Sequence, residues 1–228
     1  ENEIEIEKWL KEADEIGEFA IDTETNSLDA HQANLVGISL CYKPGYSGYI
    51  PLAHKFGKNL DESKILKILK PYLEDKSIKK IGQNIKFDYI IFYKRGIKIN
   101  SIEDTMLMSY VLDAGKNRHN MDTLSEIHLK HKPIAFKDLV GSGKKQLNFS
   151  EVEIDKAKDY AAEDADITLR LYKKFQKSLK SEKMINIYEI FEKPLIKILA
   201  FMEIEGIEID SKFLKSLSSK FEKKIQKL

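Results

Sequence analysis

The chain has 228 residues, of which 42% are hydrophobic and 33% are charged. These proportions are those of a globular protein, and the length is sufficient for a substantial hydrophobic core. The 38 basic and 37 acidic residues leave a formal net charge of +1, which excludes the strongly basic overall composition of many nucleic-acid-binding proteins.

Cys41 is the only cysteine, so an internal disulfide is excluded and a reducing compartment, the cytoplasm, is expected. No apolar run approaches the roughly 18 residues that a membrane-spanning helix requires, so no membrane is expected as a partner. The acidic first residues lack the positive region of a signal peptide. Because the sequence also begins without methionine, we expect an internal piece of a longer protein.

The N-terminal part of the chain predicts strands around a first helix. The expected strands cover residues 18–21, 34–42, 47–52 and 78–82, and a helix with apolar residues at helical spacing covers 61–73. Short connections, such as the turn at 43–45, favour an antiparallel meander. Asn84 is the expected N-cap of a further helix, which ends near Gly96.

From residue 103 onward the pattern is mainly helical. The expected helices cover residues 104–112, 121–129 and 151–179, with a basic loop at 141–145 before the last of them. Strands first and helices later indicate an α/β fold, in which a mixed β-sheet is flanked by helices.

Residues 181–228 are expected to form a separate C-terminal helical extension. Its expected elements are an amphipathic helix over 184–205, kinked or split at Pro194, a break at Gly206, an extended stretch over 207–209 and a last helix capped by Asp210 or Ser211. The sequence therefore predicts two parts, residues 1–180 and residues 181–228.

Two carboxylates follow the first strand at alternating positions. Asp22 and Glu24 are two residues apart, so on an extended strand both side chains point to the same face. A strand end is also where open α/β sheets place their sites. The alternative is a turn acid beside a surface acid, and for this short motif alone that alternative is favoured.

Two further pairs of polar residues lie one helical turn apart. Asp88 follows Asn84, and Asp164 follows Tyr160, so the members of each pair face the same way. Alone, Asp88 could be an ordinary first-turn acid that offsets the helix dipole, and Tyr160 could simply hydrogen-bond Asp164. With the pair on the first strand, these acids would repel one another strongly unless divalent cations lay between them, which is the setting of two-metal phosphoryl chemistry.

Other polar residues are expected to be structural. The five histidines show no spacing typical of metal ligands. Asp104, within a run of apolar residues, is expected to cap a helix or to be a hydrogen-bonded structural acid. Glu163 and Asp166 lie off the helix face of Tyr160 and Asp164, so we expect them to be solvated or paired with Lys or Arg.

Three segments resemble, in this order, the exonuclease motifs of proofreading 3′–5′ exonucleases: residues 19–28 (FAIDTETNSL), 81–93 (IGQNIKFDYIIFY) and 159–172 (DYAAEDADITLRLY). These enzymes form the tyrosine subclass of the DEDD superfamily. The resemblance is closest to the exonuclease domain of bacterial DNA polymerase I, a family A polymerase. It continues between the motifs, over residues 103–115, 117–126 and 141–149.

This resemblance implies a ribonuclease H-like fold for residues 1–180, which would be the 3′–5′ exonuclease domain. Residues 192–210 resemble the opening of the polymerase domain of the same enzyme. Residues 181–228 would accordingly be a linker and the first helices of a truncated polymerase domain. The implied partners are the polymerase domain of the same full-length chain and the 3′ end of single-stranded DNA, and we expect a monomer.

The resemblance also implies the roles of the acids. Asp22, Glu24, Asp88 and Asp164 would ligate two divalent metal ions. Oxygen ligands without a cluster of His or Cys suit hard cations, so Mg²⁺ or Mn²⁺ is expected. Tyr160 and Glu24 would hold the attacking water in line with the 3′-terminal phosphodiester, whose hydrolysis releases a nucleoside 5′-monophosphate.

Substrate contacts of the family also find matches. Leu28 would be an apolar wedge beside the 3′-terminal base and Phe136 an aromatic that stacks near it, a contact that tolerates any base. The positions near the terminal nucleotides and phosphates are Gln83, Asn84, Phe87 and Arg118. Packing in the core is the alternative for Leu28 and Phe136, and a surface ion pair is the alternative for Arg118. Phe87 stands where the family commonly has tyrosine, so a contact through a hydroxyl is in doubt there.

We therefore expect a metal-dependent 3′–5′ exonuclease that acts on single-stranded or frayed DNA and belongs to a DNA polymerase I. Two alternatives remain open. The first is an RNA 3′-exonuclease like RNase D, against which the polymerase-like tail argues. The second is an inactive module that binds a primer strand, against which the retention of all four acids argues.

Overall fold

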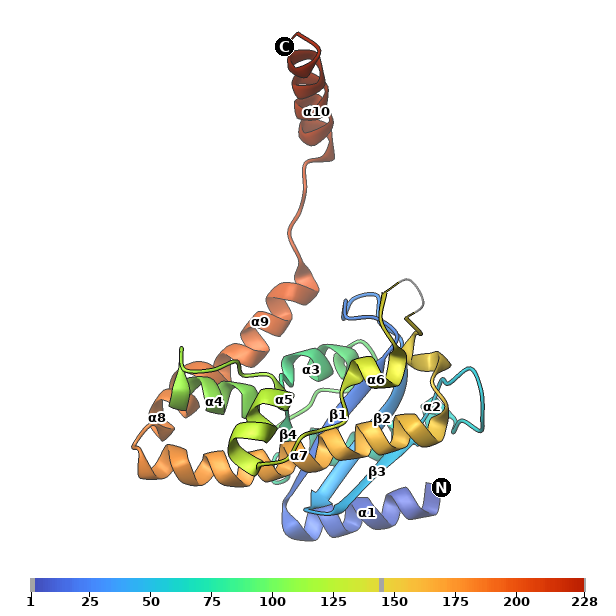
Figure 1. The fold of residues 1–228 in the computed structure, drawn as a ribbon, viewed down its shortest axis with the longest axis vertical. Coiled ribbons are helices and arrows are strands. Elements are labelled where there is room, and N and C mark those ends of the chain that lie inside the picture. Colours follow the sequence, from blue (N-terminus) through green and yellow to red (C-terminus); the bar gives the residue numbers. More distant parts are fainter. Residues whose placement is uncertain (1–2, 144–145, 228) are drawn as a thin grey trace.

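The computed structural model describes residues 3–143 and 146–227, and its centre is a five-stranded sheet in the order β3-β2-β1-β4-β5. The strands are β1 (Glu18–Thr25), β2 (Leu35–Lys43), β3 (Tyr46–Pro51), β4 (Lys79–Gly82) and β5 (Ile102–Asp104). β1 pairs antiparallel with β2 and parallel with β4, and β4 pairs parallel with β5. The predicted mixed sheet, with its antiparallel meander at one side, is confirmed (Figure 1).

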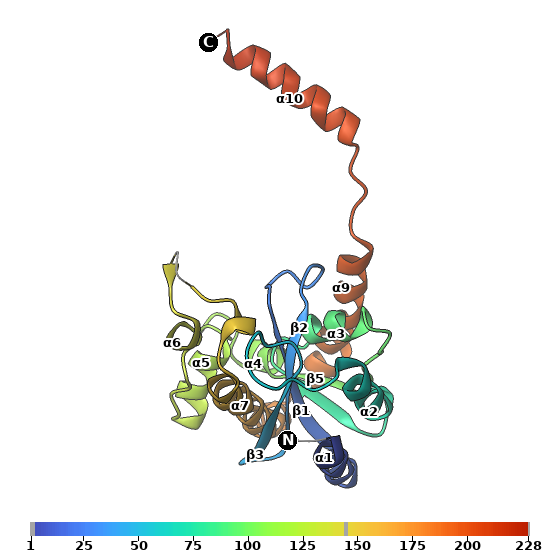
Figure 2. The ribbon, with the colours of Figure 1, turned by 90° about the vertical axis from the view of Figure 1, so that its right-hand side faces the viewer.

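Helices cover both faces of this sheet. They are α1 (Glu3–Ile16), α2 (Glu62–Glu74), α3 (Lys86–Tyr93), α4 (Thr105–Asp113), α5 (Met121–Leu124), α6 (Phe136–Val140) and α7 (Ile154–Ser181). Figure 2 shows the sheet nearly edge-on, with α7 on one face and α1 and α2 on the other. The prediction of a sheet flanked by helices is therefore also confirmed.

α7 reaches the sheet closely because its buried face begins with small residues. Ala157, Ala161 and Ala165 recur every four residues and are fully buried, which lets the helix backbone approach β1 and β2. Larger buried residues, among them Tyr172 and Phe175, follow in the second half of the helix. Asp164 lies in this part of α7, among the small residues, and reaches the acids of β1.

Three local features differ from the sequence prediction. α1 was not predicted, although Ile6, Leu10 and Ala13 bury one face of it. The three-residue strand β5 is too short to give a periodic signal. The prediction that Asn84 caps α3 is wrong: Asn84 lies in the left-handed region with φ 61°, and Ile85 precedes the helix without a side-chain cap.

The C-terminal part is helical, as predicted. It consists of α8 (Ile185–Ile187), a π-helical turn over Tyr188–Glu192, α9 (Lys193–Glu205) and α10 (Ser211–Ile225). Pro194 lies in the first turn of α9, so the predicted helix is divided just before it, and Gly206 ends it. Tyr188, Ile196 and Ala200 are buried in the core, whereas α10 lies apart from the sheet at the end of an extended segment (Figures 1 and 2).

Two further points concern the predicted basic loop and the apolar length of the helices. Lys144 and Lys145, in the predicted basic loop, lie outside the described residues. Across the described ranges, no helix is both long enough and apolar enough to cross a membrane.

Candidate active site

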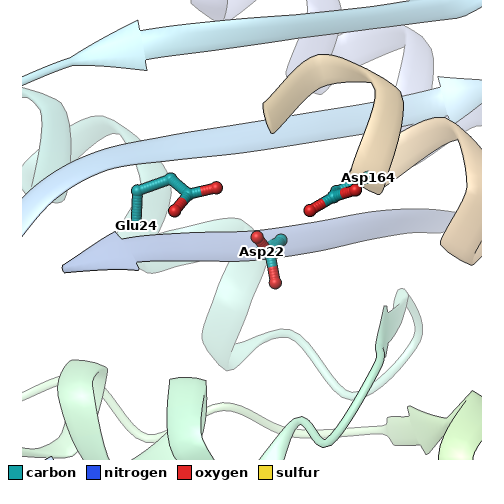
Figure 3. A group of neighbouring side chains, drawn as sticks. All are labelled: Asp22, Glu24 and Asp164. Atoms are coloured by element: carbon teal, nitrogen blue, oxygen red, sulfur yellow. The ribbon is translucent and has the colours of Figure 1, made fainter. Parts of the chain in front are cut away.

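Three carboxylates from two elements meet at the end of the sheet. Asp22 and Glu24 leave β1 on the same face, as expected for strand residues two apart, and Asp164 reaches them from α7. One oxygen of each lies within 4.8 Å of the others. Figure 3 shows the three side chains turned toward a shared space between the strand and the helix.

Burial and mutual repulsion disfavour negative charge in this group. Burial raises the pKa of Asp22 from 3.8 to about 6. Burial also raises the pKa of Glu24 well above its ordinary value, and the charges of Asp22, Asp164 and Asp88 add to the effect. The pKa of Asp164 is raised by burial and by Asp22. The folded chain therefore favours a proton or a cation among these oxygens.

Asp88 lies in the first turn of α3 and is 2% exposed. Its Oδ1 accepts hydrogen bonds from the Thr23 amide at 2.9 Å and from the Thr23 hydroxyl at 2.5 Å. Thr23 stands between Asp22 and Glu24, so these bonds fix Asp88 to the strand that carries both acids. Asp88 lies outside the group of three but lines the same cleft, and burial together with the Asp22 charge raises its pKa.

Tyr160 lies one helical turn before Asp164, so the two side chains lie on the same face of α7. Burial, followed by the charges of Asp164, Glu24 and Asp22, raises the pKa of Tyr160 far above the ordinary tyrosine value. The hydroxyl therefore stays protonated and can donate a hydrogen bond beside the acids.

An open cleft of about 410 Å³ is lined by three of the acids, Asp22, Glu24 and Asp88. The predicted substrate residues that line it are Leu28, Gln83, Asn84, Phe87 and Phe136. Leu28 is 96% exposed, which rules out the alternative that it belongs to the core. A large apolar side chain in this position is free to contact a ligand.

Phe136 lies on the opposite side of the cleft and is 42% exposed. Its ring stacks on buried Phe149 with a centroid distance of 6.4 Å and an interplanar angle of 2°. Phe149 also contacts Tyr160, with centroids 6.2 Å apart. One side of Phe136 is thus supported by the core, and the sequence analysis did not identify Phe149 as the supporting residue.

Gln83 has its amide engaged by the protein. Its Nε2 donates to the His119 carbonyl at 2.8 Å, and its Oε1 accepts from the Thr105 hydroxyl at 2.5 Å. Gln83 therefore holds the loop that carries Arg118. Arg118 is exposed and does not line the cleft, and among the described residues it forms no ion pair, in contrast to the surface alternative.

Glu163 differs from the expectation for a solvated acid. Its Oε1 accepts from His131 Nε2 at 2.8 Å and its Oε2 from the Ile134 amide at 2.7 Å. These bonds fix the segment that leads to Phe136, because a buried or half-buried carboxylate is stabilised by backbone donors. Asp166 pairs with Arg170, as predicted, and also accepts from the Gly45 amide.

The donor set fits hard divalent cations. The group consists of carboxylate oxygens from Asp22, Glu24 and Asp164, and oxygen ligands suit Mg²⁺ or Mn²⁺ better than zinc. A cation would also remove the repulsion that raises the pKa values of these acids.

Comparison with known proteins identifies the family of the chain. The 3′–5′ exonuclease family model of family A DNA polymerases matches residues 1–180. The chain therefore belongs to this family of 3′–5′ exonucleases.

The chain is also similar to bacterial DNA polymerases I. It is 43% identical to DNA polymerase I of Rhizobium leguminosarum over 94% of the chain, and 40% identical to that of Pseudomonas aeruginosa over 92%. The chain spans 23% and 24% of the length of these two relatives, so it corresponds to about a quarter of each.

Solved structures support the fold. The POL domain of Pol1 from M. smegmatis, in complex with DNA primer-template and dNTP, superposes with a TM-score of 0.78 at 20% identity, over 98% of this chain and 35% of that one. NrnC of Brucella melitensis with bound Mg²⁺ superposes with a TM-score of 0.62 at 21% identity, over 86% of this chain and 90% of that one. The predicted ribonuclease H-like fold is confirmed.

Proposed function

We propose that this domain hydrolyses the 3′-terminal phosphodiester of single-stranded or frayed DNA and releases nucleoside 5′-monophosphates. The observation that carries the proposal is the group of three carboxylates within 4.8 Å of one another, two of which, Asp22 and Glu24, line an open cleft. Family membership supports the direction of cleavage. The DNA polymerase I relatives support DNA as the substrate.

Two divalent cations, Mg²⁺ or Mn²⁺, are the proposed cofactors. Asp22, Glu24 and Asp164 would hold one of them, and Asp88, whose charge interacts with that of Asp22, would help to hold a second beside Asp22. When bound, such a pair supplies a water of lowered pKa and neutralises charge on the leaving 3′ oxygen.

The chain itself would orient the attacking water. Tyr160 keeps its proton, so its hydroxyl can donate to the water or to a phosphate oxygen beside Asp164. Glu24 projects from β1 into the same space and would accept a proton of the water. Asp22, Glu24, Asp88, Tyr160 and Asp164 are thus the proposed catalytic residues.

Leu28 and Phe136 would hold the terminal base from two sides of the cleft. The exposed Leu28 would act as a wedge, and Phe136, supported by Phe149, would stack on a base. Stacking contributes about 1–3 kcal/mol per base and tolerates every base, as an enzyme that removes any terminal nucleotide requires.

The remaining substrate contacts are proposed for Gln83, Asn84, Phe87 and Arg118. Asn84 and Phe87 present their side chains to the cleft from the start of α3. Gln83 would act mainly by holding the Arg118 loop, because both ends of its amide already bind the protein. Arg118 is free of ion pairs among the described residues and would bind a backbone phosphate.

Degradation of a 5′-labelled single strand tests this function. With Mg²⁺ or Mn²⁺, the chain should shorten the strand one nucleotide at a time from the 3′ end. EDTA and the substitution Asp22→Ala should each stop the reaction. Equal degradation under all three conditions would refute the proposal.

An RNA substrate is the second candidate. It is favoured by the structural likeness to Brucella melitensis NrnC, of which a complex with pGG is known, at a TM-score of 0.62. The DNA polymerase I relatives favour DNA instead. Rates on DNA and RNA strands of the same sequence, at the same salt concentration, distinguish the two.

We further propose the division of the chain into the exonuclease domain, residues 1–180, and the beginning of a polymerase domain, residues 181–228. The apolar residues that α9 and α10 expose, such as Met202, Phe213 and Phe221, support a polymerase domain of the same chain as their partner. The proposed state is a monomer, and the single cysteine supports a cytoplasmic location.

A further inference from the structure

The turn before α3 contains a residue in the left-handed region. Asn84 has φ 61°, a conformation that is uncommon outside glycine but that asparagine adopts more often than most residues. The amides of Asn84 and Ile85 follow each other in this turn, and successive amides of this kind form a concavity that binds an anion. In this protein the anion is the carboxylate of Asp104.

The side chain of Asp104 connects the turn before α3 with the first turn of α4. Its Oδ1 accepts from the Asn84 amide at 3.2 Å and its Oδ2 from the Ile85 amide at 3.0 Å. The same Oδ1 also caps α4 by accepting from the amides of Met106 at 2.9 Å and Leu107 at 3.3 Å. Asp104 is 1% exposed, so these bonds are protected from water.

The C-terminal extension holds Asp104 in turn. The backbone amide of Asp104 donates to the Tyr188 hydroxyl at 2.9 Å. That hydroxyl donates to Glu103 Oε2 at 3.0 Å, and Lys193 donates to Glu103 Oε1 at 2.7 Å. Tyr188 is fully buried. A continuous set of hydrogen bonds therefore runs from the extension to the turn that begins α3.

Given the proposed function, we propose that Asp104 is a positioning residue of the exonuclease site and that Tyr188 of the C-terminal extension keeps it in place. Asp104 fixes the turn from which Asn84, Phe87 and Asp88 reach the cleft. It does not touch the acids, so it acts through the position of α3. The polymerase-side extension is thereby part of the framework of the nuclease site.

Asp104→Asn separates this role from helix capping. Asn caps helices as well as Asp does, and its Oδ1 can keep the bonds to Met106, Leu107 and Asn84. Its amide NH₂ would then face the Ile85 amide, donor against donor. A residue that only capped α4 would tolerate this change. A residue that positions the turn would not.

The matched control is Asp61→Asn. Asp61 caps α2 by accepting from the Lys64 amide at 2.9 Å, and it lies on an element away from the cleft. We expect Asp61→Asn to leave the rate of 3′-nucleotide release and the affinity for Mn²⁺ unchanged. Both variants keep a capping side chain, so a difference between them reports on the turn.

The test combines hydrogen exchange of the metal-free chain with Mn²⁺ titration and exonuclease kinetics. For Asp104→Asn we expect faster exchange over 84–88, unchanged exchange over 106–112, weaker Mn²⁺ binding and a fall in kcat of about 10-fold, as for residues that orient metal ligands. If Asp104→Asn matches Asp61→Asn in exchange over 84–88 and in Mn²⁺ affinity, the positioning role is refuted. These two readouts remain decisive even if the wild-type chain fails to cut DNA, which would refute the proposed function alone.

Tyr188→Phe tests the contribution of the extension. The substitution removes one hydroxyl and leaves the Asp104 amide without its acceptor. Its matched control is Tyr172→Phe, which removes the hydroxyl of another buried tyrosine. That hydroxyl accepts from Gln176 at 2.9 Å and from Lys79 at 3.2 Å and does not line the cleft. We expect Tyr188→Phe to speed exchange over 84–88 and to lower kcat less than Asp104→Asn does. Equal exchange and kcat in the two Tyr→Phe variants would remove Tyr188 from the proposal.

Discussion

Carboxylates occur in two different settings in this fold: Asp104 lies among hydrogen-bond donors, and Asp22 lies among other acids. Burial raises the pKa of Asp22 and of Asp104 to about 6 each. Hydrogen bonds from four backbone amides oppose the rise of the pKa at Asp104. The neighbours of Asp22 are instead two other acids, Glu24 and Asp164. The comparison teaches that burial alone does not mark a catalytic acid. The site differs from Asp104 in that its acids lie beside one another, whereas Asp104 is held by backbone donors.

The largest expected effect is on catalysis within the cluster. Asp164→Asn should lower the exonuclease rate by at least about 10³-fold, the scale of removing one member of a catalytic unit. The same substitution should stabilise the metal-free fold by roughly 1 kcal/mol, because it removes one buried like charge. Single-turnover kinetics and urea unfolding in EDTA measure the two effects. A variant that is both active and unchanged in stability would show that Asp164 belongs to neither a metal site nor a repulsive cluster.

Tyr160→Phe should lower the rate less, by about 10²-fold, since it removes a hydroxyl that orients but keeps the acids. The free energy of unfolding should change little, because the ring contacts with Phe136 and Phe149 remain. The pH dependence of kcat, compared with that of the wild type, checks the assignment. A rate equal to that of the wild type would exclude the hydroxyl from the reaction.

Asp104→Ala provides the contrast on stability. It leaves four backbone amides without their acceptor, so the free energy of unfolding should fall by about 3 kcal/mol. Asp164→Asn and Asp104→Ala should therefore shift the urea midpoint in opposite directions. Shifts in the same direction would contradict the distinction between the two groups of acids.

Proton linkage gives a further way to test the cluster. In the folded chain the pKa of Asp22 is raised from 3.8 to about 6, and those of Glu24, Asp88 and Asp164 are raised as well. The folded state therefore holds more protons than the unfolded state above pH 3.8, and the free energy of unfolding should fall as the pH rises through this window. Melting temperatures in EDTA between acidic and neutral pH measure the trend, and Asp22→Asn should weaken it. A rise in stability over the same window would contradict the assignment.

A last effect is expected from the metal ions on the melting temperature. Saturating Mn²⁺ should stabilise the wild type by about 2.7 kcal/mol at one hundred times its dissociation constant. Asp164→Asn should abolish most of this gain, whereas Asp61→Asn should keep it. A wild type that melts at the same temperature with and without Mn²⁺, and that also fails to degrade DNA, would favour an inert strand-binding module.

Local sequence patterns predicted which site residues of the same strand or the same helix face the same way. The alternation of a strand places Asp22 and Glu24 on one face, and the helical period does the same for Tyr160 and Asp164. The family resemblance supplied the order of the motifs. Together these features predicted which acids to examine, but not how far apart they lie.

The remaining parts depend on contacts between distant residues. Thr23 holds Asp88, which is 65 positions away in sequence, and Asp104 fixes a turn 19 and 20 positions before it. Asn84 adopts the left-handed conformation where its amide meets Asp104, whereas a rule based on local spacing predicted an N-cap. Asp104 was predicted correctly as a hydrogen-bonded structural acid, but its link to the site could be found only in three dimensions.

A crystal structure of the chain with Mn²⁺ and a nucleoside 5′-monophosphate tests the central claim most directly. The account predicts anomalous scattering from Mn²⁺ bound to oxygens of Asp22, Glu24 and Asp164, a second ion on the Asp88 side of Asp22, and the nucleotide base between Leu28 and Phe136. Well-ordered side chains of these three acids with no Mn²⁺ among them, at a millimolar concentration of the metal, would contradict it.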